Sequence, residues 1–165
     1  SPHLILWIGK VKNITLSKEF FWKEIHNYIV NKYTMESIIS VDKLTSYYKQ
    51  LLEIGNVKKI STKDNLVWRV KLDYLTSHIE NYRCSSGYFN EYDLKSLEEI
   101  NSIVNRKYQT FSYYGFDKKV LSSFIKKNMP LGIDRIVPIG KTSEFSLNWD
   151  GYNLISTLSR IIQII

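Results

Sequence analysis

The stretch Leu66–Asp73, LVWRVKLD, indicates the fold most directly, because its side chains alternate in character. The even-numbered residues from Leu66 to Leu72 are all apolar, and Arg69 and Lys71 stand between them. A period of two is typical of a β-strand that buries one face. The stretch Val57–Ser61 precedes it across the turn-like Lys63-Asp64-Asn65, so the two stretches together predict a β-hairpin.

Four further strands are expected on either side of this hairpin. Leu4–Ile8 is a short apolar run closed by Gly9, and its length favours a buried strand over a helix. Tyr88–Asp93 follows the turn-forming sequence Ser-Ser-Gly at 85–87. Tyr108–Tyr114 and Ile133–Ile139 also have strand character, and both end at a glycine.

Two helices are expected in the first half of the chain. The first runs from Ser17 to about Tyr33, because Phe21, Ile25 and Ile29 recur every four positions. The second runs from about Asp42 to Ile54, and a glycine follows it as a C-terminal stop. The apolar residues of this second helix share one face, which is formed by Val41, Leu44, Tyr48, Leu51 and Leu52.

Three more helices are expected in the second half. The sequence Ser-Leu-Glu-Glu at 96–99 is a capping box, which starts a helix. Asp117 is placed to cap another helix, which Pro130 ends. The last helix begins near Asp150, which can cap it, and carries one apolar stripe: Leu154, Leu158, Ile161 and Ile165. Strands and helices then alternate, which favours an α/β layer with at least partly parallel strands.

The bulk properties of the chain restrict its class. Its 165 residues fit a single domain, and no internal repeat or long linker divides it. No apolar run is long enough for a transmembrane helix, and no signal-peptide pattern is present. The one cysteine, Cys84, fits a reducing compartment. We therefore expect a cytoplasmic protein without a membrane span.

The net charge of +7 leaves several kinds of partner open. A basic balance is compatible with nucleic acid, anionic lipid or a phosphorylated ligand. It is equally compatible with an AT-rich coding sequence that uses lysine freely, which the abundance of Lys, Asn, Ile and Tyr favours. The alternative function is therefore a basic, tyrosine-rich nucleic-acid-binding module whose phosphate contacts would come from Lys10, Lys12, Lys58, Lys59, Lys63, Lys118, Lys119, Lys126 and Lys127.

Two motifs in the tail stand at a specific spacing. The first is GIDRIVPIGK at 132–141, and the second is WDGYNLI at 149–155, followed by LSR at 158–160. Together they resemble the end of the LuxC-type long-chain acyl-CoA reductases, which belong to the aldehyde dehydrogenase superfamily. The stretch YQTFSYYG at 108–115 and the start SPHL at 1–4 are similar to the same family. Residues 10–82 match it only in their pattern of helices and strands.

The resemblance implies both a fold and an activity. The fold is a partial aldehyde-dehydrogenase-like catalytic domain, three-layer, with a mostly parallel sheet and an added hairpin. The activity is reduction of a fatty acyl-CoA, or of an acyl group on a related carrier, to a fatty aldehyde with NADPH. A cysteine thiolate takes the acyl group as a thioester, which is still electrophilic enough for hydride attack.

The resemblance also implies where the chemistry lies. It places the nucleophilic cysteine just before Ser1 and the cofactor domain further upstream, so the chain alone is expected to be the inactive C-terminal part of the enzyme. His3 would then lie near the active-site loop, where it either contacts the thioester or packs. The family's ribose-binding glutamate falls near Arg83 in a loose alignment, a departure from the pattern, and Glu91 is the nearest acidic candidate for contacting the cofactor.

Other residues have weaker claims to function. Trp149 either walls an acyl channel or belongs to the core. Cys84 does not match the position of the nucleophile and is expected to be structural. The three histidines are too far apart for a local metal motif, so no metal is expected. The expected partners are an acyl-CoA or acyl-carrier substrate, together with further copies of the chain or acyl-transfer subunits.

Overall fold

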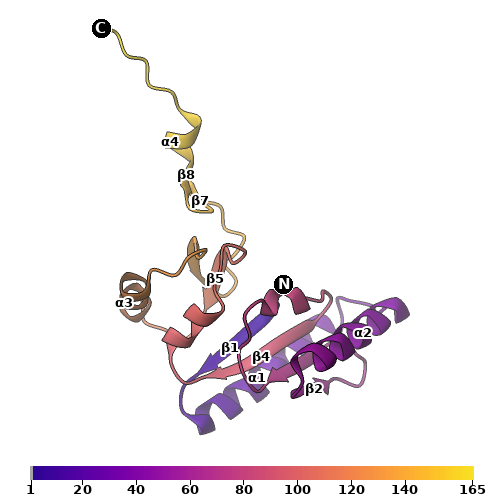
Figure 1. Ribbon diagram of the computed structural model, residues 1–165. Helices are drawn as coiled ribbons and strands as arrows, with labels where there is room; N and C mark the ends of the chain where they lie inside the picture. The colour runs from indigo at the N-terminus through magenta and orange to yellow at the C-terminus, as the bar shows by residue number, and fades with distance from the viewer. Residues whose placement is uncertain (1) are drawn as a thin grey trace. The chain divides into compact units, whose positions relative to one another are not determined.

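A computed structural model describes residues 2–165 of the chain. The chain divides into two compact units, Ser1–Ile103 and Val104–Ile165. In the described part of the chain, the first unit has one β-sheet and the second has two small ones, and Figure 1 colours the chain by residue number. Among residues 2–165, no helix has both the length and the apolar character required to cross a bilayer.

The first unit is built on a four-stranded mixed sheet in the order β1-β4-β3-β2. β1 (Leu4–Ile8) is parallel to β4 (Tyr88–Leu94), which is also parallel to β3 (Trp68–Leu72). β2 (Val57–Ser61) pairs with β3 in an antiparallel hairpin. The predicted hairpin and the predicted mostly parallel pairing are therefore confirmed.

Helices α1 (Val11–Ile29) and α2 (Ser37–Ile54) cover opposite faces of this sheet (Figure 1). Trp22 of α1 packs on Phe89, with ring centroids 5.1 Å apart. Gln50 of α2 instead bonds to Tyr88, the residue next to Phe89 along β4. Because successive side chains of a strand point to opposite faces, the two helices form separate layers. The first unit is thus three-layered.

Both helices begin earlier than the sequence predicts. α1 starts at Val11 rather than Ser17, and α2 starts at Ser37 rather than near Asp42. Neither start has a side-chain cap, so the signal sought at Ser17 does not mark the boundary. The half-buried Ile14 continues the inward stripe of α1 by one more turn, and packing thus extends the helix beyond its capping signals.

The side chains that α2 buries completely are polar. Lys43 and Gln50 are fully buried, whereas Leu44 is 39% exposed and Leu52 is 86% exposed. The physical reason lies in the sheet below the helix. β4 presents the hydroxyl of Tyr88 and the amide of Asn90 to this layer, and buried polar groups require hydrogen-bond partners that leucine cannot supply.

Two short 3-10 helices flank β4 in sequence, η1 (Ile79–Tyr82) and η2 (Leu97–Ser102). The predicted capping box is present at η2. The side chain of Ser96 accepts a hydrogen bond from the backbone amide of Glu99, and the side chain of Glu99 accepts one from the backbone amide of Ser96. The helix that it starts is a short 3-10 segment rather than the α-helix expected from the sequence.

The second unit is a βαβ arrangement. β5 (Thr110–Tyr113) and β6 (Arg135–Pro138) pair in parallel, and α3 (Lys118–Asn128) connects them. The side chain of Asp117 accepts a hydrogen bond from the amide of Lys119, which confirms the predicted cap. Leu121 and Phe124 are the buried residues of this helix.

The end of the chain differs from the prediction. β7 (Asn148–Trp149) and β8 (Tyr152–Asn153) form a small hairpin around Asp150 and Gly151. Both turn residues have positive φ, 47° and 79°, as a type I′ turn requires. Asp150 is therefore a turn residue, and its prediction as a helix cap is wrong.

The cap of the final helix is Asn153, whose side chain accepts from the amide of Ser156. This helix, α4 (Leu154–Leu158), is much shorter than the predicted stripe to Ile165. Ile161 and Ile165 are fully exposed and outside any helix. A helix this short gains little from propensity alone, and without packing it does not propagate.

Candidate functional site

Glu91 of β4, the candidate for contacting the cofactor, is a buried carboxylate that accepts several hydrogen bonds. It is 1% exposed. Its Oε2 accepts hydrogen bonds from the indoles of Trp7 (2.9 Å) and Trp22 (3.1 Å). The guanidinium of Arg69 donates from Nε to Oε1 (2.5 Å) and from Nη2 to Oε2 (3.3 Å). Four donors thus saturate the carboxylate from within the first unit.

This geometry does not fit a ribose contact at Glu91. A ribose hydroxyl would have to reach a carboxylate that is inside the layer between α1 and the sheet and already engaged by two tryptophans and an arginine. The role of Glu91 toward a cofactor stays a prediction. In this structure Glu91 of β4 connects three other elements, because its hydrogen-bond donors come from β1, α1 and β3.

His3 lies directly ahead of β1, where its carbonyl accepts from the amide of Asn90 (2.9 Å). The side chain is half-buried. Burial lowers the pKa of His3, and the positive charge of Arg83 lowers it further, while Glu80 opposes this shift. The neighbours of His3 are thus Arg83 and Glu80, and the structure does not place it in the cluster around Glu91.

Lys43 and Cys84 lie in the layer between α2 and the sheet. The ammonium of Lys43 donates to the carbonyls of Asn65 (2.7 Å) and Leu66 (3.2 Å), and it forms no salt bridge with the carboxylates of residues 2–165. Burial lowers the pKa of Lys43 to about 8, and interactions with Cys84 and Asp64 only partly oppose this. Cys84 itself is a half-buried free thiol. The lysine therefore connects α2 to the turn of the β2–β3 hairpin through these two hydrogen bonds.

The depressed pKa of Lys43 predicts that stability rises with pH. Below pH 8 the lysine is charged in both the folded and unfolded chain, so the folded state bears the full cost of burying the charge. Between pH 8 and the unfolded value of 10.5 the folded state releases its proton first. We expect urea denaturation to show an unfolding free energy about 1 to 2 kcal/mol higher at pH 9.5 than at pH 7.

The control for this effect is Lys43→Met, which keeps the length of the side chain and removes the titrating amine. Its stability should be nearly flat over the same range. The upper limit of pH 9.5 matters because burial raises the pKa of Tyr88, which destabilises the fold once unfolded tyrosine ionises. The same pH dependence in the variant and the parent chain would assign it to another group.

Trp149 belongs to the second unit. The guanidinium of Arg135 lies 4.0 Å from its ring centroid, and Phe145 packs against it at 5.4 Å. Arg135 also donates to the carbonyls of Thr142 (3.1 Å) and Glu144 (2.9 Å). These contacts give Trp149 a place in the scaffold of the tail, and its role in an acyl channel stays a prediction.

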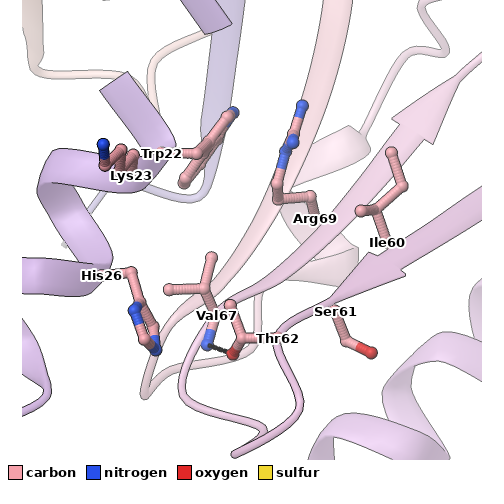
Figure 2. Close-up of a pocket in the computed structure, with 8 residues that line it drawn as sticks. All are labelled: Trp22, Lys23, His26, Ile60, Ser61, Thr62, Val67 and Arg69. Atoms are coloured by element: carbon pink, nitrogen blue, oxygen red, sulfur yellow. Dashed lines mark hydrogen bonds between the residues drawn. The ribbon is translucent and has the colours of Figure 1, made fainter. Parts of the chain in front are cut away.

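A pocket of about 260 Å³ opens between α1 and the β2–β3 hairpin, as Figure 2 shows. Three basic side chains line it with apolar and hydroxyl groups, and none of its lining residues is acidic. Its floor includes the buried Val67. The lining residues are Trp22, Lys23, His26, Ile60, Ser61, Thr62, Val67 and Arg69.

Two side-chain contacts fix the walls of this pocket. His26 Nε2 lies 2.6 Å from Oδ2 of Asp64, which links α1 to the turn of the hairpin. The hydroxyl of Thr62 and the amide of Leu66 also donate to Asp64, and these bonds and His26 hold the pKa of its carboxyl at about 2 against the effect of burial. Arg69 forms the second contact, with Glu91.

Little in the sequence indicates this pocket. Its residues come from a helix and two strands about forty positions apart, so no local motif contains them. The one available signal was Arg69, which with Lys71 is a charged residue between the apolar positions of this strand. The nine lysines of the nucleic-acid hypothesis are likewise distributed over several elements. One of them, Lys59, lies 4.1 Å from the ring centroid of Trp68 in a cation–π contact.

Neither models of known protein families nor curated protein sequences match the chain.

Proposed function

We propose that this chain forms part of the catalytic half of an acyl-CoA reductase, which converts a fatty acyl-CoA to a fatty aldehyde with NADPH through a cysteine thioester. The proposal begins from the resemblance of the tail motifs to the LuxC-type enzymes. It concerns the role of this chain within such an enzyme.

One structural observation supports the proposal. The three stretches that carry the resemblance in the second unit form a single local structure. Residues 108–115 and 132–141 contribute the parallel strands β5 and β6, which pair side by side. Residues 149–155 pack against the second of these: Trp149 stacks on Arg135, and Gly151 lies close to the carboxylate of Asp134. Motifs that belong to one family are expected to share a scaffold in this way.

The close approach of Gly151 to Asp134 explains why the second motif contains glycine. A Cβ at position 151 would stand 3.0 Å from Oδ1 of Asp134, and φ at this residue is +79°. Both the space and the backbone conformation therefore favour glycine. The motif residues Asp134, Arg135, Trp149 and Gly151 thus depend on one another structurally, independent of any catalytic role.

The reacting thiol of the proposed reaction is the cysteine that the resemblance places directly before Ser1. Its thiolate would displace coenzyme A from the acyl-CoA, and hydride from NADPH would then release aldehyde and restore the thiolate. Cys84 is assigned a structural role, since it lies beside Lys43 and Tyr88 in the α2 layer.

The test is NADPH oxidation with fatty acyl-CoA, measured on the protein translated from the complete reading frame that encodes this chain. We expect turnover in that protein and none from residues 1–165 alone. Replacing the cysteine before Ser1 with alanine should abolish both turnover and the acyl-enzyme that labelled acyl-CoA forms before NADPH is added.

The matched control is Cys84→Ala in the same protein. It should retain turnover within about twofold, because the thiol is not the nucleophile. Loss of activity in this variant with retention in the other would reverse the assignment. Reductase activity from residues 1–165 alone would contradict the proposal.

A further inference from the structure

We propose that the pocket between α1 and the β2–β3 hairpin binds a phosphate monoester carried on a small ring such as ribose. Three basic side chains, Lys23, His26 and Arg69, line this pocket without an acidic residue among them. Hydroxyl and apolar groups complete the walls. The combination suits a ligand with one anionic group and one compact, less polar body.

Arg69 is the best-positioned donor in the pocket. Its guanidinium is held by Glu91 through Nε and Nη2 and lies 5.0 Å from the ring centroid of Trp22. A guanidinium carries five N–H donors, and Nη1 of Arg69 has no partner within residues 2–165. The group is therefore fixed in place before a ligand arrives, which lowers the entropic cost of binding an oxyanion.

Lys23 and His26 supply further donors from α1. His26 uses Nε2 in its contact with Asp64, which leaves Nδ1 for another partner. Over the described part of the chain, Lys23 takes part in no ion pair. Glu91 balances the charge of Arg69 from outside the lining, whereas the ammonium of Lys23 has no such partner among the described residues. An anion is the complementary ligand.

The size of the pocket favours a phosphorylated ring over free phosphate. About 260 Å³ is just below the usual range for drug-sized ligands, and a bare phosphate would leave most of this volume to water. Ile60 and Val67 offer apolar contact to a ring. Figure 2 shows these groups on the hairpin side, across from Trp22 and His26 on the helix.

The chemistry of the ligand is inferred from the pocket alone. Which molecule carries the phosphate is inferred from the proposed function. Coenzyme A carries a phosphate monoester on the 3′ position of its ribose. NADPH carries the same group on a 2′ position. Both present a dianionic phosphate on a compact ring, and simple nucleotides reproduce each end.

The experiment is a titration of residues 1–165 with 3′-AMP, 2′-AMP and adenosine, followed through the indole N–H signals in ¹H–¹⁵N spectra. Trp22→Phe identifies the signal of Trp22. We expect at least one nucleotide to move that signal saturably and to bind about tenfold or more tighter than adenosine. Preference for 3′-AMP points to coenzyme A as the source, and preference for 2′-AMP points to NADPH.

Two charge-matched variants on α1 sharpen the test. Lys23→Gln should weaken nucleotide binding about fivefold and leave adenosine unchanged, because only the phosphate contact is lost. Lys12→Gln removes the same charge from an exposed position outside the pocket lining and should change neither affinity. Equal binding of all three ligands, or equal binding by Lys23→Gln and the parent chain, overturns the proposal.

Failure of the two proposals can be told apart. Nucleotide binding at Trp22 without reductase activity in the full protein leaves the pocket assignment in place and removes the enzyme assignment. Reductase activity with no phosphate-dependent shift at Trp22 does the opposite.

Discussion

Glu91→Ala is expected to destabilise the first unit by about 3 to 5 kcal/mol, the largest loss for any single side chain described above. The carboxylate is 1% exposed and accepts from two indoles and one guanidinium. The side chain of Arg69 is only 19% exposed, and alanine at position 91 would remove its counter-charge. It would also leave two tryptophan N–H groups without an acceptor. Urea denaturation followed by tryptophan fluorescence measures the loss.

The matched control for Glu91 is two residues along the same strand. Asp93 points to the same face and contacts Lys18 and Lys71, but 38% of its side chain is exposed. Asp93→Ala should therefore cost about 1 kcal/mol or less, because solvent screens exposed ion pairs. Equal losses for the two variants would show that burial does not set the strength of the Glu91 cluster.

Glu91→Gln separates the charge from the shape. It keeps the volume and an acceptor for the tryptophans, and it replaces the other carboxylate oxygen, which faces Arg69, with a neutral amide NH2. We expect a loss between those of the two alanine variants. Full retention of stability in Glu91→Gln would contradict an ionic role for the carboxylate.

Gly87→Ala is expected to cost about 3 kcal/mol or more, the second large effect. A Cβ at this position would stand 2.2 Å from the carbonyl oxygen of Leu66, which belongs to the backbone and cannot rotate away. The residue also has φ of +86°, and its own carbonyl accepts from the amide of Trp68 (2.8 Å). Relief of the clash would therefore disturb the junction between β3 and β4.

The control is Gly55→Ala at the end of α2. This glycine has a similar φ of +76°, but nothing lies within 4 Å of its Cβ position. Its ψ is −157°, so its replacement carries the conformational strain without the clash and should cost about 1 to 2 kcal/mol, less than Gly87→Ala. The difference between the two variants in thermal denaturation isolates the steric contribution. Similar losses at both sites would mean that backbone conformation alone explains the effect.

The elements that could be predicted from the sequence are those specified by local patterns. The alternation in Leu66–Asp73 describes a strand wherever its partners lie, and β3 with its hairpin follows from it. The cap at Asp117 is likewise local, because donor and acceptor are two residues apart. Such signals need no knowledge of the remaining chain.

The features that could not be predicted depend on partners that are distant in sequence. Lys43 and Gln50 are buried because Tyr88, Asn90 and the hairpin carbonyls are across the layer from them. Nothing within α2 itself signals this, and its apolar residues suggest the opposite face. The pocket has the same origin, since its basic groups meet only after α1 and the hairpin have packed.

The parallel pairing of β1 with β4 also has a consequence for how the chain is made. Leu4 is paired with Asn90, 86 positions further along, whereas Thr110 in the second unit meets Arg135 after only 25. During translation β1 therefore leaves the ribosome long before β4, the strand it pairs with, has been synthesised. Its apolar sequence, LILWI, has no paired strand during that interval. The pairing of β1 with β4 is therefore expected to be a late and slow step in the folding of the first unit.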